Sequence, residues 1–276
     1  MSHRPSYLRV FYTFGRNSLI RDMTFRTNFI IQCVSSLGWT LMNLGFYALI
    51  FKLTPMIGED TGWGKYEFFV FLATTYFVNS LVQTFFMPNA EEFSELIRTG
   101  GLDFVLLKPI DTQFIVSLRR VAWSQLTNFV FGLLLLAYAL SNLAYRPGLV
   151  EVLLYPMYVV CGVLIMYSLM LSLSASSVWL GRNQTLYNFW FYITNFSRYP
   201  LEIYRGNLLG ESLQLTFTYM IPVLVVINVP ARLLAKPLQP GEGRLAIFAL
   251  LATVVSLIVS RWIFRRSLLS YRSASS

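Results

Sequence analysis

The sequence predicts an all-α polytopic membrane protein with six transmembrane helices. Hydrophobic residues make up 55% of the chain and charged residues only 13%, well below the roughly 25% of an average soluble domain. A helix needs about 20 residues to span the apolar core of a bilayer, where a charge costs several kcal/mol. The stretches that contain no charged residue are 29–51, 68–90, 121–145, 152–181, 183–197, 212–231 and 245–260.

Residues 1–28 are expected to form a cytoplasmic amphipathic helix that lies along the membrane surface. Five arginines alternate there with aromatic and aliphatic side chains, and Asp22 is the only acid. Basic helices with an apolar face are typical of such interfacial segments. Residues 29–276 then form the six-span domain.

The spans follow from the apolar stretches and the turns between them. The first covers about 29–51, and the second ends before Pro88. A polar loop, residues 88–120, precedes a third span at about 121–145. A tight turn with Pro147 and Gly148 separates this span from a long fourth span at about 149–180.

The distribution of basic residues predicts the orientation. Most Lys and Arg side chains fall in the N-terminal segment, the 88–120 loop and the C-terminal segment, which places both termini in the cytoplasm. The number of crossings is then even, so one apolar stretch does not cross. In one arrangement 183–200 is the fifth crossing and 206–232 is a re-entrant hairpin on the outer side. In the other, 183–205 is interfacial and 212–231 crosses. The count of basic residues leaves Arg198, Arg205 and Arg232 unassigned. The charge rule slightly prefers the second arrangement, which places Arg198 and Arg205 inside.

Several kinds of chemistry have no counterpart in the sequence. There is no G-x-x-x-x-G-K-[ST] phosphate loop, no ionisable residue at mid-depth in a span, and no histidine or carboxylate cluster typical of a metal or acid–base site. We therefore expect no enzyme activity and no catalytic, metal or cofactor-binding residue. The net charge of +9 flanks apolar runs instead of forming a basic face, so no nucleic-acid partner is expected.

The 88–120 loop carries the most distinctive pattern. Glu91, Glu92, Glu95 and Arg98 recur at helical spacing around apolar residues, which predicts a short amphipathic helix. Gly100–Gly101 is expected to end it, because glycine readily adopts the left-handed cap conformation.

The residues that follow, in the run I-R-T-G-G-L-D-F-V-L-L-K-P-I, resemble the cytoplasmic loop of ABC type-2 exporter permeases. The matching positions are Gly100, Gly101, Leu102, Asp103, Leu106 and Pro109. The prolines of the late region, Tyr199–Pro200, Pro222 and Pro230–Ala231, resemble one branch of the same superfamily.

The resemblance implies the permease subunit of an ATP-driven ABC exporter in the bacterial cytoplasmic (inner) membrane. Such a permease forms its pathway with a second permease subunit, the same chain or a related one, and membrane lipid surrounds both. Separate ABC ATPase subunits bind the ATP. The loop forms a coupling helix that contacts an ATPase, the N-terminal helix makes a second contact, and a re-entrant segment precedes the last span. The implied coupling residues are Glu91, Glu92, Glu95, Arg98, Gly100, Gly101, Leu102, Asp103, Leu106, Lys108 and Pro109.

An alternative is an energy-independent channel, or a scaffold that anchors a soluble partner through the 88–120 loop. A secondary carrier fits less well, because the spans lack mid-depth charges and visible internal repeats. The sequence leaves the substrate and the choice between homodimer and heterodimer open, and the export direction rests on the resemblance.

Overall fold

A computed structural model describes residues 6–58, 61–180, 191–237 and 242–271, and the regular elements in these ranges are helices. Five helical segments are long and apolar enough to cross a membrane, and a bent helix pair is a sixth candidate. The predicted all-helical polytopic fold is therefore confirmed. The five are α2 (Arg26–Leu53), α3 (Lys65–Phe85) with α4 (Met87–Thr99), α7 (Leu126–Asn142) with its preceding turn, α8 (Leu149–Ala175) with α9 (Ser177–Leu180), and α13 (Glu242–Ser270).

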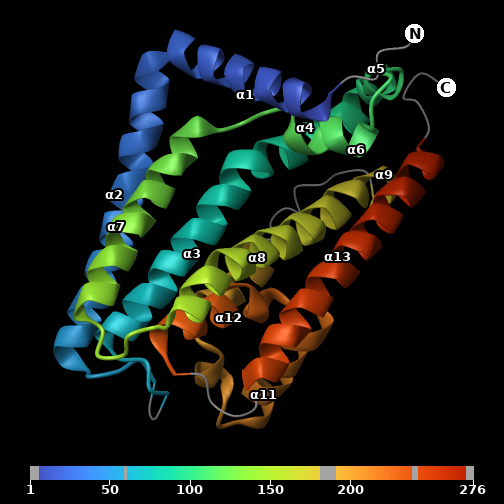
Figure 1. The fold of residues 1–276 in the computed structure, drawn as a ribbon. Helices are drawn as coiled ribbons and strands as arrows, with labels where there is room; N and C mark the ends of the chain where they lie inside the picture. Colours follow the sequence, from blue (N-terminus) through green and yellow to red (C-terminus); the bar gives the residue numbers. More distant parts are fainter. Residues whose placement is uncertain (1–5, 59–60, 181–190, 238–241, 272–276) are drawn as a thin grey trace.

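The N-terminal segment forms helix α1 (Tyr7–Thr24), which ends at a break at Phe25. Figure 1 shows α1 across one end of the bundle, with α2 running away from it. The same end holds α4, α5 (Leu102–Leu106) and α6 (Thr112–Leu118), together with the last described residues of the chain. The basic segment is thus helical as predicted, and its contact with a membrane surface stays a prediction.

The third span begins later than the sequence indicates. Val121 and Ala122 are not helical, a 3-10 turn (η1, Trp123–Gln125) follows, and α7 starts only at Leu126. The backbone N–H groups of this segment bond sideways instead of along a helix. Val121 N donates to Ser18 Oγ at 3.1 Å, and Ala122 N donates to Thr84 O at 2.9 Å. These lateral bonds tie α1, α3 and α7 together.

Helix α3 lies at the centre of the bundle. It packs against α7, α8 and α12 (Val223–Ala235), and most of its side chains are buried. Aromatic residues from α3 and its neighbours fill the surrounding core, with Phe68 and Phe71 stacked at 5.7 Å between ring centroids.

Helix α2 packs on the core through Tyr47 and Phe51 in its second half, and neutral polar side chains hold its first half. Only 11% of the apolar stretch that makes α2 a candidate span is buried. The polar residues Gln32, Ser36 and Thr40 lie along one face of the helix and bond across to α7 and η1. Asn128 donates to Ser36 Oγ at 2.7 Å and accepts from Thr40 Oγ1 at 3.0 Å, and Ser124 donates to Gln32 at 3.0 Å. Intramembrane amides that the sequence leaves without a role therefore attach α2 to the bundle.

The segment before the last span gathers at the end of the bundle opposite α4–α6 (Figure 1). It contains η2 (Phe196–Arg198), η3 (Leu201–Tyr204), α11 (Leu208–Leu215), the π-turn η4 (Thr216–Met220) and α12. The α11–η4 helix and α12 meet at an 88° bend. Much of the predicted crossing 183–200 lies outside the described residues, because the structure leaves out 181–190.

Replacing Asn128 by Leu is expected to lower the free energy of unfolding by about 1 kcal/mol, since interhelical hydrogen bonds in membranes contribute roughly 0.6–1.7 kcal/mol. Ser36 and Thr40 then lose their shared partner on α7. Unfolding in mixed micelles measures the change. Asn142→Leu is the matched control, because among the described residues Asn142 bonds to Tyr138 and Ser141, both on α7. Equal effects of both variants would contradict the role assigned to Asn128.

Candidate functional site

Helix α4 begins where α3 breaks, at Phe86–Met87, and it carries Pro88 in its first turn. It ends at Gly100, whose φ of 73° is the left-handed cap conformation predicted for this position. A Cβ on Gly101 would come within 2.9 Å of Leu96 Cδ2. The two glycines therefore turn the chain sharply from α4 into the short helix α5.

Helix α5 has one buried and one exposed face. Leu102 and Val105 are buried in a cluster with Phe93, Leu171 on α8 and Phe264 on α13. The opposite face exposes 74% of Phe104 and 81% of Leu107, with Leu106 beside them at 40%. An apolar tip (Phe104, Leu106 and Leu107) thus projects from a base that is anchored on α8 and α13.

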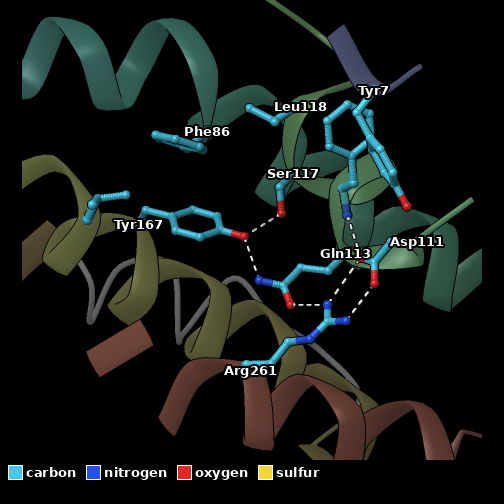
Figure 2. Close-up of a pocket in the computed structure, with 10 residues that line it drawn as sticks. Tyr7, Phe86, Asp111, Gln113, Ser117, Leu118, Tyr167 and Arg261 are labelled. Atoms are coloured by element: carbon cyan, nitrogen blue, oxygen red, sulfur yellow. Dashed lines mark hydrogen bonds and ion pairs between the residues drawn. The ribbon is translucent and has the colours of Figure 1, made fainter. Parts of the chain in front are cut away.

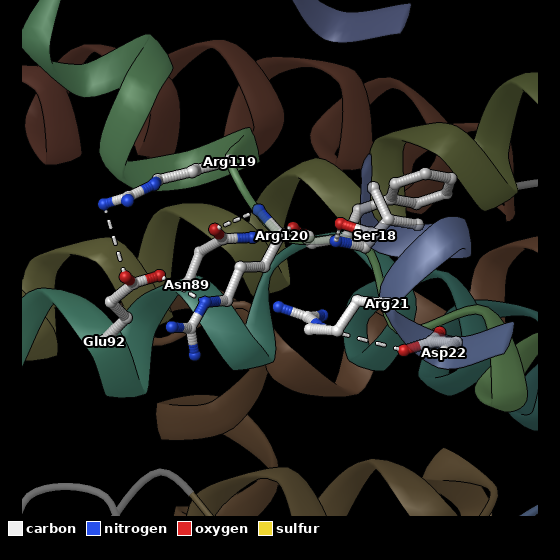
Figure 3. A network of polar contacts seen from close by, with 9 residues as sticks. Ser18, Arg21, Asp22, Asn89, Glu92, Arg119 and Arg120 are labelled. Atoms are coloured by element: carbon white, nitrogen blue, oxygen red, sulfur yellow. Dashed lines mark hydrogen bonds and ion pairs between the residues drawn. The ribbon is translucent and has the colours of Figure 1, made fainter. Parts of the chain in front are cut away.

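Asn89 joins the start of α4 to the chain that enters α7 (Figure 3). Its buried amide donates to Phe85 O and Arg120 O at 2.7 Å each, and it accepts from Arg120 N at 2.8 Å. Glu92, one helical turn later, pairs with Arg120 at 2.8 Å and Arg119 at 3.3 Å. These contacts fix α4 relative to α6 and α7.

Helix α1 attaches to the same junction. Besides the Ser18–Val121 contact, Trp123 Nε1 donates to Gly15 O at 3.1 Å. An added Cβ at Gly15 would touch the Trp123 ring at 3.5 Å, so the helix approaches the indole closely. The N-terminal helix and the 88–120 loop therefore form one packed unit.

A polar network connects this unit to α8 and α13 (Figure 2). Asp111 caps α6 by accepting from Phe114 N at 3.0 Å, and it also pairs with Arg261 on α13. Arg261 donates to Gln113 as well, and Gln113 donates to Tyr167 OH on α8 at 2.9 Å. The Arg261 guanidinium holds the pKa of the Asp111 carboxyl below its ordinary value of 3.8, against the opposing effect of burial.

The network lines a pocket of about 590 Å³ between α1, α6, α8 and α13. The rest of the wall is formed by aromatic side chains and a few smaller ones: Tyr7, Phe86, Phe114, Ser117, Leu118 and Leu164. The described parts of the chain hold no group of three or more His, Cys, Asp or Glu side chains able to bind a metal ion.

The structure brings the sequence-predicted residues into one region, but not all onto one surface. Glu91, Glu95 and Arg98 are exposed on α4, and Glu95 pairs with Arg98. Glu92 instead turns inward to Arg119 and Arg120, and Leu102 is buried. Asp103 is half-buried, whereas Leu106, Lys108 and Pro109 are exposed.

Sequence reasoning missed the exposed Phe104 and Leu107, and it missed the Asp111–Arg261 pair. Asp111 has a recognisable signal, since an aspartate before a helical stretch is a common N-cap. Nothing in the sequence relates it to Arg261, which lies far along the chain.

A sequence model of the ABC-2 family transporter proteins matches residues 37–275. The chain belongs to the ABC-2 transporter family. This ABC-2 protein is thus a multi-pass membrane component of a transporter, and its family implies ABC ATPase subunits as partners in general. The resemblance predicted from the loop is confirmed. No curated protein and no solved structure shows significant similarity to the chain.

The Asp111–Arg261 pair should give the protein a specific acid sensitivity. Because the folded-state pKa of Asp111 is lowered, the stability from this pair is complete above about pH 4 and is lost as the pH falls through the folded pKa. Asp111→Asn keeps a good N-cap residue but removes the ion pair, which for partly exposed pairs is worth about 0.5–1 kcal/mol.

Thermal unfolding in detergent at several pH values checks this expectation. The difference between wild type and Asp111→Asn should stay constant from about pH 7 to 5, begin to shrink near the ordinary carboxyl pKa of 3.8, and vanish only after the pH has fallen through the lower folded-state pKa. Glu95→Gln, which removes a fully exposed pair within α4, is the control and should have almost no effect. A pH-independent difference for Asp111→Asn would contradict the role of the ion pair.

Proposed function

We propose that this chain is the permease subunit of an ATP-driven ABC exporter and that α4 and α5 form its coupling element. The observation that carries the proposal is the apolar tip on α5, formed by Phe104, Leu106 and Leu107. It lies at one end of the bundle, outside the apolar spans, and the polar residues Arg98, Asp103 and Lys108 surround it in the chain. An apolar centre with a polar rim is the usual composition of a protein–protein contact.

The base under the tip supports a mechanical role. A push on α5 is passed to α8 and α13 through the buried cluster around Phe93 and Phe264. It is passed to α13 a second time through Asp111 and Arg261, and to α7 through Asn89. The ATPase would thereby move several spans at once, and the chain itself needs no nucleotide-binding site.

The proposed orientation places α1, α4–α6 and both termini in the cytoplasm of a bacterium, with the protein in the inner membrane. The basic residues near this end, including Arg119, Arg120, Arg265 and Arg266, agree with the positive-inside rule. The second permease subunit, a copy of this chain or a related one, is proposed to meet the bundle along α2, whose apolar side chains are largely exposed.

For the fifth crossing we favour 183–200, with 206–232 re-entrant from the outer side. The two ends of the hairpin meet, because Glu202 before α11 pairs with Arg232 near the end of α12 at 3.1 Å. Trp63, in the loop between α2 and α3, donates to Glu202 at 2.9 Å, and Lys236 donates to Thr61 O at 2.8 Å. Both ends are thus held by the same loop, whereas a crossing helix would separate them by the bilayer thickness.

Cysteine labelling tests this topology. Leu208→Cys and Pro237→Cys, at the two ends of the hairpin, should both react with a membrane-impermeant maleimide in intact cells. Leu107→Cys should react only after permeabilisation. If position 237 reacts in intact cells and position 208 does not, then 212–231 crosses and the re-entrant assignment is wrong. The native Cys33 and Cys161 lie within spans, and wild type gives the background.

Changes at the apolar tip should abolish ATPase coupling. We expect Phe104→Glu or Leu107→Glu to weaken binding of a candidate ABC ATPase from a neighbouring gene by tenfold or more, since each buried apolar side chain contributes about 1.5–3 kcal/mol. Copurification and ATP turnover of the coexpressed complex measure the effect. Leu149→Glu is the matched control, because Leu149 is 76% exposed at the start of α8, away from both α5 and α2.

An ATPase that binds wild type and tip variants equally would contradict the coupling assignment. Failure of any ATPase to bind would favour a channel or a scaffold. Circular dichroism and size-exclusion profiles of each variant establish that the membrane domain is intact.

A further inference from the structure

A second pocket, of about 430 Å³, lies at the end of the bundle where α11, η4 and α12 gather. Its wall includes two arginines, a glutamate and two neutral polar residues. These are Arg205, Arg232, Glu211, Gln214 and Thr218, with Leu245 of α13 beside them. The pocket is far from the coupling element, and the proposed function gives it no role.

Thr218 is the clearest sign that this pocket accepts a polar group. Its side chain is 97% buried, since its exposed fraction is 3%, and its Oγ1 has no hydrogen-bond partner in the part of the chain that the structure describes. Buried hydroxyls are almost always paired, so an orphaned one calls for an explanation. Thr218 lies on the π-turn η4, closed by Ile221 N donating to Thr216 O at 3.0 Å, and π-turns are frequent at functional sites.

The charges around the pocket are balanced but separated. Arg232 is neutralised by Glu202 at 3.1 Å, and both are largely buried. Arg205 and Glu211 are exposed, and within the described ranges neither forms an ion pair. They therefore present one positive and one negative charge at the same opening, together with the Thr218 hydroxyl and the Gln214 amide.

We propose that this pocket binds the zwitterionic phosphate–amine headgroup of an amphipathic molecule. The phosphate accepts from Arg205 and the Thr218 hydroxyl, and the amine donates to Glu211. A purely anionic headgroup would leave Glu211 facing negative charge. The apolar part has a surface beside the pocket, because Leu208, Leu209 and Met220 on α11 and η4 are each more than 75% exposed. The site does not depend on ATPase coupling.

The test uses the full chain in detergent and three probes: short-chain phosphatidylethanolamine, short-chain phosphatidylglycerol and soluble glycerophosphoethanolamine. Native mass spectrometry or calorimetry gives their affinities. Wild type should prefer phosphatidylethanolamine over the other two. Arg205→Gln should lower the affinity for both lipids about tenfold, the scale of one charged hydrogen bond. Glu211→Gln should abolish the preference for phosphatidylethanolamine over phosphatidylglycerol.

Thr218→Val should weaken the binding of both lipids severalfold, because their phosphate loses one donor. Thr218→Ser keeps a hydroxyl with little change in volume and should bind them like wild type. Arg146→Gln and Glu151→Gln are matched controls, since both lie in or after the turn between α7 and α8, outside the pocket. Equal affinity of wild type and Arg205→Gln would overturn the site. If wild type binds phosphatidylglycerol as tightly as phosphatidylethanolamine, the headgroup need not be zwitterionic and that part of the proposal is wrong. If it binds glycerophosphoethanolamine as tightly as phosphatidylethanolamine, the ligand need not be amphipathic and that part is wrong.

Discussion

The structure depends on one constraint: inside a bilayer there is no water to bond to, so backbone polar groups, and most polar side chains with them, find their partners within the protein. Helix α2 shows the result, because its amide and hydroxyl side chains bond across to Asn128 and Ser124 although little of the helix is buried. The backbone obeys the same rule at breaks. Where α3 gives way to α4, the side chain of Asn89 satisfies the carbonyl of Phe85, and the chain entering α7 bonds to Thr84 and Ser18.

The two ends of the bundle solve different problems with similar contacts. At one end, Asp111 joins the start of α6 to Arg261 on α13, and Asn89 joins α4 to the chain that enters α7. At the other end, the Glu202–Arg232 pair joins the residues before α11 to the last turn of the buried helix α12. Each ion pair joins segments that are distant in sequence.

Local signals predicted those elements whose cause is local. The long apolar runs gave the spans, the acidic helical spacing predicted α4, and Gly100 ends it in the expected left-handed conformation. Glu92 was harder, because it shares the helical spacing of Glu91 and Glu95 and its inward orientation is decided by Arg119 and Arg120. The start of α7 was also misplaced, since apolar composition does not reveal that lateral bonds replace helical ones at Val121.

The sequence by itself determined the class of protein and its family, because hydrophobicity and the Gly100–Pro109 motif are properties of contiguous residues. Only the tertiary structure decided which side chains hold the helices together and which are exposed to a partner or a ligand. The apolar tip at Phe104 and Leu107, the Asp111–Arg261 pair and the orphaned hydroxyl of Thr218 each depend on which helix lies opposite. That choice is made by packing among residues far apart in the chain, and no local pattern records it.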